Sequence, residues 1–195
     1  SVDVANPKLW SVDSPNLYWV RTEIIQNGKV VDSTDSRFGI RYIATDPNSG
    51  FYLNGVHTKL NGVCEHSDLG SLGMETYQAA VDRRIRTLKK YGVNAIRTSH
   101  NPVSPEFIEA CDRLGMLVFE EAFDQWLYSK NSDDYHNYFN KAADGKTVVF
   151  DKAGNDNTNN DTSYIEVKRD DLQSNAERDI KAMVERDKNA PCIFA

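Results

Sequence analysis

Polar and charged side chains gather at three places along the chain, each directly after a short apolar stretch. They are His66 and Asp68, then Arg97 and His100, then Glu121, Asp124 and Trp126. Carboxylates and histidines transfer protons, guanidinium groups bind carboxylates, and an indole ring can stack on a sugar ring. If the apolar stretches are parallel strands, their carboxyl ends meet at one edge and bring these side chains together. The alternative for each residue is structural: a loop cap, a loop histidine or a packed indole.

The segment from Asn94 to Glu121 carries the elements that would position two of these groups. Ala95–Thr98 predicts a short strand, and Leu117–Glu120 predicts a second strand that is buried on both faces. Between them, Ser104-Pro105 predicts the start of a helix with one apolar face, and Gly115 predicts its end. Strand, helix and strand in this order form a βαβ unit, which requires a parallel sheet.

A strand and a helix are also predicted before this unit. Thr58–Val63 predicts a first buried strand, which would end just before His66. Glu75–Tyr91 predicts an amphipathic helix. The predicted buried stripe of that helix comprises Tyr77, Val81, Ile85 and Leu88. The adjacent Glu120 and Glu121 would point to opposite faces of their strand, so they cannot act as a catalytic pair.

The last third of the chain begins with a polar, turn-rich segment, residues 127–165, which predicts a loop without regular structure that includes the Asp144–Thr162 insertion. A helix capped by Asp170-Asp171 follows. Residues 186–191 predict a turn, and Cys192 predicts the start of a fourth strand.

Residues 1–50 have the pattern of antiparallel strands. Tyr18–Gln26 and Lys29–Asp35 predict a hairpin around Asn27-Gly28, since both turn residues tolerate positive φ. Phe38–Tyr42 predicts another strand. So few strands cannot close a sandwich alone, so this part is predicted to be the end of a β-sandwich.

Composition excludes several classes of protein. The 195 residues are 39% hydrophobic with a net charge of −6 and no basic tract, which argues against nucleic acid and anionic membranes as partners. No apolar run approaches the ~20 residues of a membrane helix. Cys64, Cys111 and Cys192 all stand in apolar contexts, which predicts buried free thiols.

The longest motif runs through the βαβ unit. It comprises Asn94, Ile96, Arg97, Thr98, Ser99, His100, Pro102, Phe107, Ile108, Asp112, Gly115 and the apolar run 116–119. This pattern resembles the first signature of the family 2 glycoside hydrolases, whose members include β-galactosidases and β-glucuronidases. Four earlier segments resemble the end of that family's immunoglobulin-like domain: Pro7–Ser11, Pro15–Tyr18, Phe38–Arg41 and Gly50–Gly55.

The resemblance implies a fold and a division into domains. Residues 1–50 would be the C-terminal part of an immunoglobulin-like antiparallel β-sandwich. Residues 51–195 would be the N-terminal part of a (β/α)8 TIM barrel, with its first three to four βα units.

The resemblance also implies a function. The parent protein would be a retaining glycoside hydrolase that cleaves terminal β-galactosides. Its acid/base Glu would end strand four and its nucleophile strand seven, both after Ala195, so this chain alone is predicted to be inactive. The substrate-binding residues would be His66, Asp68, Arg97, His100, Glu121, Asp124 and Trp126. Arg97 would also keep a catalytic carboxylate ionised.

No cofactor is implied. Gln125 and Trp126 stand in the region where relatives have a magnesium-binding Glu and a His, so no metal ligand is carried over. The predicted partners are a β-galactoside or other β-glycoside and either the rest of the same polypeptide or another copy that binds through the open edge of strand four.

Three alternatives remain at this point. One is a carbohydrate-binding or scaffold piece without turnover, and another is a β-glucuronidase or β-mannosidase of the same family. A metal-dependent barrel hydrolase is disfavoured, because Cys64-Glu65-His66 does not supply the His-x-His expected on strand one.

Overall fold

The computed structural model describes residues 3–122, 147–150, 165–168 and 172–195. The chain divides into two compact units, one of residues 1–121 with 185–195 and the other of residues 122–184. Among the described residues, none of the helices is long and apolar enough to cross a membrane.

The second unit contains one antiparallel strand pair and most of one helix. Strand β9 (Thr147–Phe150) pairs with β10 (Ile165–Lys168), and helix α4 spans Leu172–Asp187. The prediction that residues 127–165 lack regular structure is therefore wrong at β9 and at the first residue of β10.

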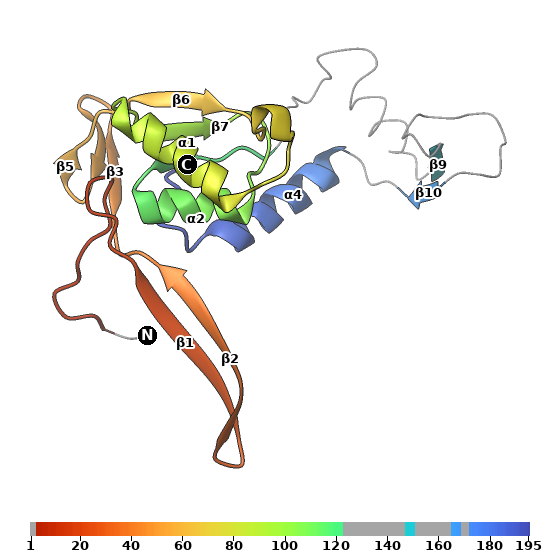
Figure 1. The fold of residues 1–195 in the computed structure, drawn as a ribbon, viewed down its shortest axis with the longest axis horizontal. Coiled ribbons are helices and arrows are strands. Elements are labelled where there is room, and N and C mark those ends of the chain that lie inside the picture. Colours follow the sequence, from red (N-terminus) through yellow and green to blue (C-terminus); the bar gives the residue numbers. More distant parts are fainter. Residues whose placement is uncertain (1–2, 123–146, 151–164, 169–171) are drawn as a thin grey trace. The chain divides into compact units, whose positions relative to one another are not determined.

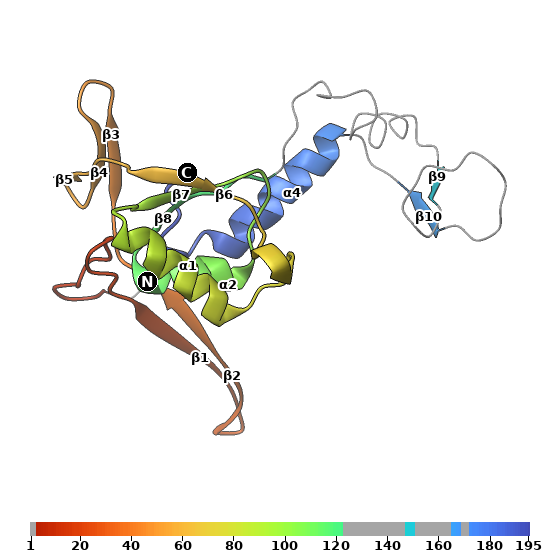
Figure 2. The same ribbon diagram turned by 45° about the horizontal axis from the view of Figure 1, so that its top comes forward.

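The first unit is built around a parallel sheet of three strands. They are β6 (Gly62–Glu65), β7 (Ala95–Thr98) and β8 (Leu117–Phe119), hydrogen-bonded in that order, as Figure 2 shows. Val118 N donates to Cys192 O at 2.8 Å and Phe194 N donates to Val118 O at 3.0 Å. The chain after α4 thus lies parallel to β8 and is joined to it by an isolated bridge between Val118 and Ile193, so the predicted fourth strand beside the third is present only as this bridge.

Two helices lie side by side on one face of this sheet (Figure 1): α1 (Gln78–Lys90) and α2 (Pro105–Leu114). Helix α2 begins and ends as predicted, because Ser104 Oγ accepts from Phe107 N at 3.2 Å and Gly115 adopts a left-handed conformation. Helix α1 starts later than predicted. Tyr77 is its N-cap and is 52% exposed, so its place in the buried stripe was wrong.

The antiparallel strands precede this sheet. Strands β1 (Tyr18–Gln26) and β2 (Lys29–Phe38) form the predicted hairpin, with positive φ at Asn27 and Gly28. A three-stranded sheet follows, formed by β3 (Ile43–Asp46), β4 (Gly50–Leu53) and β5 (Val56–His57). Whether these strands belong to a larger sandwich stays a prediction, as does the domain division at residue 50.

Two strands were predicted at the wrong residues. In both cases, residues distant in sequence form hydrogen bonds to the backbone of the predicted strand or pack against it. Residues 39–42 are not a strand: Ile40 O accepts from Trp10 N, and a side chain at Gly39 would collide with Pro191. The first parallel strand starts at Gly62 instead of Thr58. The Asn94 side chain binds Lys59 O and Asn61 N in the segment before it.

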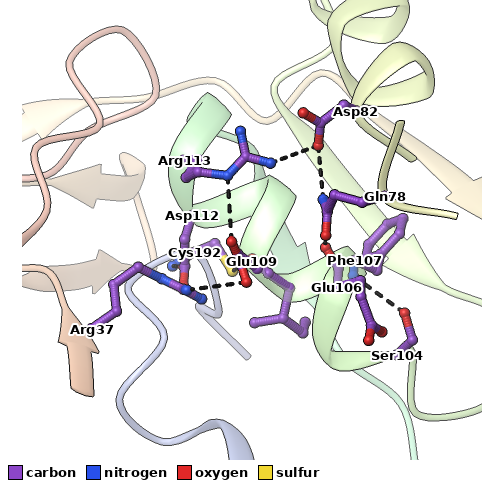
Figure 3. A network of polar contacts seen from close by, with 11 residues as sticks. Arg37, Gln78, Asp82, Ser104, Glu106, Phe107, Glu109, Asp112, Arg113 and Cys192 are labelled. Atoms are coloured by element: carbon purple, nitrogen blue, oxygen red, sulfur yellow. Dashed lines mark hydrogen bonds and ion pairs between the residues drawn. The ribbon is translucent and has the colours of Figure 1, made fainter. Parts of the chain in front are cut away.

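A buried carboxylate joins three separate parts of the first unit (Figure 3). Asp112 of α2 accepts from Arg37 of β2 at 3.0 Å and from the backbone N of Cys192 at 3.0 Å. Its own backbone oxygen accepts from the indole of Trp10 at 2.8 Å. Because Asp112 is only 1% exposed, these buried contacts fix Cys192 and the end of β2 to α2.

Candidate binding site at the carboxyl edge of the sheet

Three of the predicted residues meet where β7 and β8 end. Arg97 Nε donates to Glu121 Oε1 at 2.5 Å, and His100 Nδ1 lies 2.8 Å from Glu121 Oε2. The Glu121 backbone N donates to Thr98 Oγ1 at 2.9 Å, which fixes the start of the loop after β8. We call Arg97, His100 and Glu121 the edge cluster.

The edge cluster is partly open to solvent. The Arg97 side chain is 44% exposed, whereas Glu121 is 17% exposed. His100 Nδ1 also lies 3.2 Å from Arg97 Nη2, but one ring nitrogen cannot donate and accept at once. Donation from Nδ1–H to the Glu121 carboxylate satisfies both partners, since Arg97 has only donors. The cluster therefore presents a charged carboxylate held between two oriented donors.

His66 joins this cluster and Asp68 does not. The His66 and His100 rings meet edge to face, with their centroids 6.0 Å apart. The Asp68 carboxylate instead accepts from Gly70 N at 3.2 Å, at the start of a 3₁₀ helix, Gly70–Leu72. Asp68 thus stabilises its own loop, and a role in substrate binding stays a prediction.

Arg84 of α1 holds the loop that carries His66. Its guanidinium pairs with Glu65 at 2.9 Å and donates to the backbone oxygens of His66 and Asp68. The amphipathic pattern of residues 75–91 did not indicate this contact. Asp124 and Trp126 lie outside the described residues, so their predicted roles stay predictions.

Cys64 is a neighbour of the edge cluster that the sequence did not indicate. It was predicted to be buried but is exposed, with Sγ 3.5 Å from Arg97 Nη1. Cys64 and Arg97 are paired across β6 and β7, so they project on the same face. The correct strand register would have predicted that Cys64 and Arg97 lie on the same face. The prediction placed the start of this strand at Thr58, so that pairing was not recognised.

Glu120 has different partners from Glu121, as the alternation of strand residues predicts. It is buried and lies 3.1 Å from Arg186, which also contacts Asp187 at 2.6 Å and donates to Val103 O at 2.8 Å. Arg186 and Asp187 close helix α4, so the turn predicted from residue 186 starts too early. Burial, and then the charge of Asp187, raise the pKa of Glu120 to about 7.

The contacts of Glu120 with Arg186 and Asp187 predict that the free energy of unfolding falls as the pH rises from 5 to 8. The folded-state pKa of Glu120 lies above its unfolded value, so the folded state binds the extra proton and loses that advantage as pH rises through about 7. The side chain in Glu120→Gln is neutral at every pH. We therefore expect this variant to lack the pH-dependent decrease in the free energy of unfolding, which is on the order of 2 kcal/mol. Urea denaturation at several pH values measures it. A slope unchanged in Glu120→Gln would contradict the assignment.

Comparison with known proteins places this arrangement in a family. Residues 45–195 match the model described as glycosyl hydrolases family 2, TIM barrel domain, and residues 1–41 match the model described as glycosyl hydrolases family 2. The chain belongs to glycoside hydrolase family 2. The three parallel strands and their helices are thus part of its barrel domain, as the resemblance implied.

Similar proteins carry more than one name. Over 138 residues the chain is 45% identical to beta-galactosidase BoGH2A of Bacteroides ovatus, a match that covers 71% of this chain and 16% of that protein. It is 43% identical over 134 residues to a putative beta-glucuronidase of Formosa agariphila, a match that covers 69% of this chain and 13% of that protein. Family membership therefore does not decide the sugar.

Solved structures are similar over nearly the whole chain. A family 2 member from Bacteroides cellulosilyticus has a TM-score of 0.75 at 39% identity, covering 98% of this chain and 20% of its own. A beta-glycosidase from Bacteroides vulgatus has a TM-score of 0.75 at 33% identity, also covering 98% and 20%. This chain spans about a fifth of the length of these structures, so the activity of a whole protein is a separate question.

Proposed function

We propose that the protein containing this chain is a retaining glycoside hydrolase acting on terminal β-galactosides. In this proposal the edge cluster and His66 form part of the wall that binds the sugar. The two catalytic carboxylates lie outside residues 1–195. The observation that carries the proposal is the fixed Arg97–His100–Glu121 cluster at the carboxyl edge of the sheet, where barrel enzymes bind substrate.

The edge cluster suits hydroxyl recognition. Glu121 offers acceptor positions, and His100 and Arg97 hold it in a single orientation. Side chains fixed before the ligand arrives lose little entropy on binding, and they orient the ring toward the reacting groups. Arg97 would also lower the pKa of a catalytic carboxylate brought beside it.

The charges at this edge favour a neutral sugar over a glucuronide. Among the described residues that end these strands or contact the loops after them, three carboxylates (Glu65, Asp68 and Glu121) stand against two guanidiniums (Arg84 and Arg97). Both guanidiniums are already paired, Arg84 with Glu65 and Arg97 with Glu121. A glucuronate carboxylate would add a fourth negative charge beside them. β-Glucuronidase is the second candidate, because a relative named putative beta-glucuronidase is 43% identical and one named beta-glucuronidase is 34% identical to this chain.

Hydrolysis of nitrophenyl glycosides by the full-length protein tests the proposal. We expect kcat/KM for the β-galactoside to exceed that for the β-glucuronide by more than about tenfold, since one uncompensated charge costs several kcal/mol. A preference for the glucuronide would overturn the galactoside assignment. No turnover on any glycoside would favour a carbohydrate-binding or scaffold role. Residues 1–195 alone are expected to be inactive.

A further inference from the structure

Glu120 and its partners lie directly beside the edge cluster, on the side of helix α4. Glu120 precedes Glu121 in the chain, and its backbone N donates to Ala195 O at 2.9 Å. Its carboxylate lies 3.1 Å from Arg186 Nη2, and its side chain is only 3% exposed. Segments that pack against this unit in a longer protein can only lower that exposure. The contacts of Glu120 therefore do not depend on an open face of the sheet.

Arg186 gathers three acceptors around one nitrogen. Its Nη2 donates to Val103 O at 2.8 Å, and it lies 2.6 Å from Asp187 Oδ2 and 3.1 Å from Glu120 Oε1. Its Nε also donates to Asp187, at 2.7 Å. Hydrogen bonds between ionised partners are roughly twice as strong as those between neutral groups. Arg186 thus ties together the residue after β8, the end of α4 and the loop before α2.

Val103 connects Arg186 to His100. It is 6% exposed, and it lies three residues after His100 and directly before Ser104, which caps α2. At the other end of the same loop, Ser99 N donates to Glu65 O at 2.9 Å. The segment of residues 99–103 is therefore held at both ends, and Arg186 holds the end that leads into α2.

Arg186 is thereby linked to both partners of one contact in the edge cluster. Glu121 directly follows Glu120, and His100 Nδ1 lies 2.8 Å from Glu121 Oε2. Binding side chains keep a productive geometry only when the residues behind them are fixed as well. We propose that Arg186 is a positioning residue of the sugar site, which holds Glu121 through Glu120 and His100 through Val103. This inference rests on the proposed function, because that proposal assigns the edge cluster to the sugar.

Arg113 provides a matched control for Arg186. It pairs with Asp82 at 2.7 Å and lies 3.6 Å from Glu109, and its side chain is 33% exposed, against 37% for Arg186. Asp82 lies on α1 and Glu109 on α2, and in the described part of the chain neither contacts the edge cluster. Arg113→Met therefore removes a half-buried cation from two carboxylates, as Arg186→Met does, but leaves the edge cluster with its contacts.

The first test is steady-state kinetics of the full-length protein on the nitrophenyl glycoside that it hydrolyses best. We expect Arg186→Met to lower kcat/KM by about tenfold or more, because a misplacement of about 1 Å can lower a rate about 100-fold. Arg113→Met should stay within about threefold, because the edge cluster keeps its geometry. Arg186→Lys should recover part of the loss, since an ammonium group has three donors for the three acceptors.

A double-mutant cycle separates positioning from a general loss of stability. If Arg186 acts through the edge cluster, Arg186→Met should cost less than about threefold in a protein that already carries His100→Asn and Glu121→Gln. A merely structural role would give the same factor in both backgrounds. Where Arg186→Met alone unfolds, its combination with Glu120→Gln carries the same test, because it removes the buried carboxylate that would lack a cation.

A crystal structure of full-length Arg186→Met, or of its combination with Glu120→Gln, gives a readout that needs no glycoside. We expect the Glu121 carboxylate or the His100 ring to move by about 1 Å or more from its wild-type position, and to stay in place in Arg113→Met. An unmoved edge cluster, equal kinetic losses in Arg186→Met and Arg113→Met, or the same factor in both backgrounds would each overturn the proposal. If no glycoside were hydrolysed, the hydrolase proposal would fail, and these positions would still decide the role of Arg186.

Discussion

Replacing Arg97 by glutamine in the full-length protein is expected to lower kcat/KM for its glycoside by about 100-fold or more. Arg97 is the cation that Glu121 contacts, and Glu121 is only 17% exposed. Without Arg97, the Glu121 carboxylate keeps His100 as its one side-chain donor among the described residues and is free to rotate. Steady-state kinetics on the best nitrophenyl glycoside measures the loss.

A matched control exists on the hairpin. Arg21 of β1 also pairs with a carboxylate, that of Asp35 of β2, through two hydrogen bonds at 2.8 and 2.7 Å, but its side chain is 65% exposed and belongs to the antiparallel pair. Arg21→Gln should leave kcat/KM within about twofold, as exposed pairs contribute little. Arg97→Lys should fall between the two, because an ammonium group cannot match the guanidinium fork. A loss of less than threefold in Arg97→Gln would remove the edge cluster from the substrate site.

The second large effect is expected on stability, at Asp112. Asp112→Ala removes the acceptor of the Cys192 backbone N and the closest carboxylate to Arg37, which then keeps Glu109, at 3.6 Å, as its one carboxylate partner among the described residues. Burial raises the pKa of Asp112 even though Cys192 and Arg37 lower it, so the pairing does not fully offset the cost of desolvation. Breaking such a buried pair from one side costs about 3–5 kcal/mol.

The network in Figure 3 shows why the loss should spread beyond one contact. Asp112 of α2 contacts Arg37 of β2 and the backbone of Cys192, so its removal releases both from α2. Asp112→Asn keeps an acceptor for Cys192 N and should cost less. Asp35→Ala, at an exposed pair, should move the unfolding midpoint far less than Asp112→Ala. Urea denaturation followed by tryptophan fluorescence compares them, and equal midpoints for Asp112→Ala and Asp35→Ala would contradict this account.

The parts of the fold that were predictable from sequence depend on neighbouring residues. Ser104, Gly115 and the Asn27-Gly28 turn act through their own backbone, so the ends of helix α2 and the turn of the β1–β2 hairpin were predicted correctly. Residues 39–42 and 58–61 depend on Pro191 and Asn94, which are distant in sequence. No local pattern reports that kind of contact, and the strands were misplaced there.

The candidate site likewise contains residues that could be predicted from sequence and residues that could not. The rule that parallel strands end at one edge was enough to bring His66, Arg97, His100 and Glu121 together. Asp68 binds its own loop because a short carboxylate competes well for nearby backbone N–H groups. The buried Glu120–Arg186 pair was missed, although a carboxylate pointing into the core of a sheet requires a cation or a proton.

A crystal structure of the full-length protein with galactose bound would test the central claim most directly. The account predicts a sugar ring at the carboxyl edge of β6–β8, with at least one hydroxyl within hydrogen-bond distance of His66, His100, Arg97 or Glu121. A ring bound at the other end of the strands, for example in the cavity of about 480 Å³ lined by Val12, Asn54, Lys89 and Asn94, would contradict it.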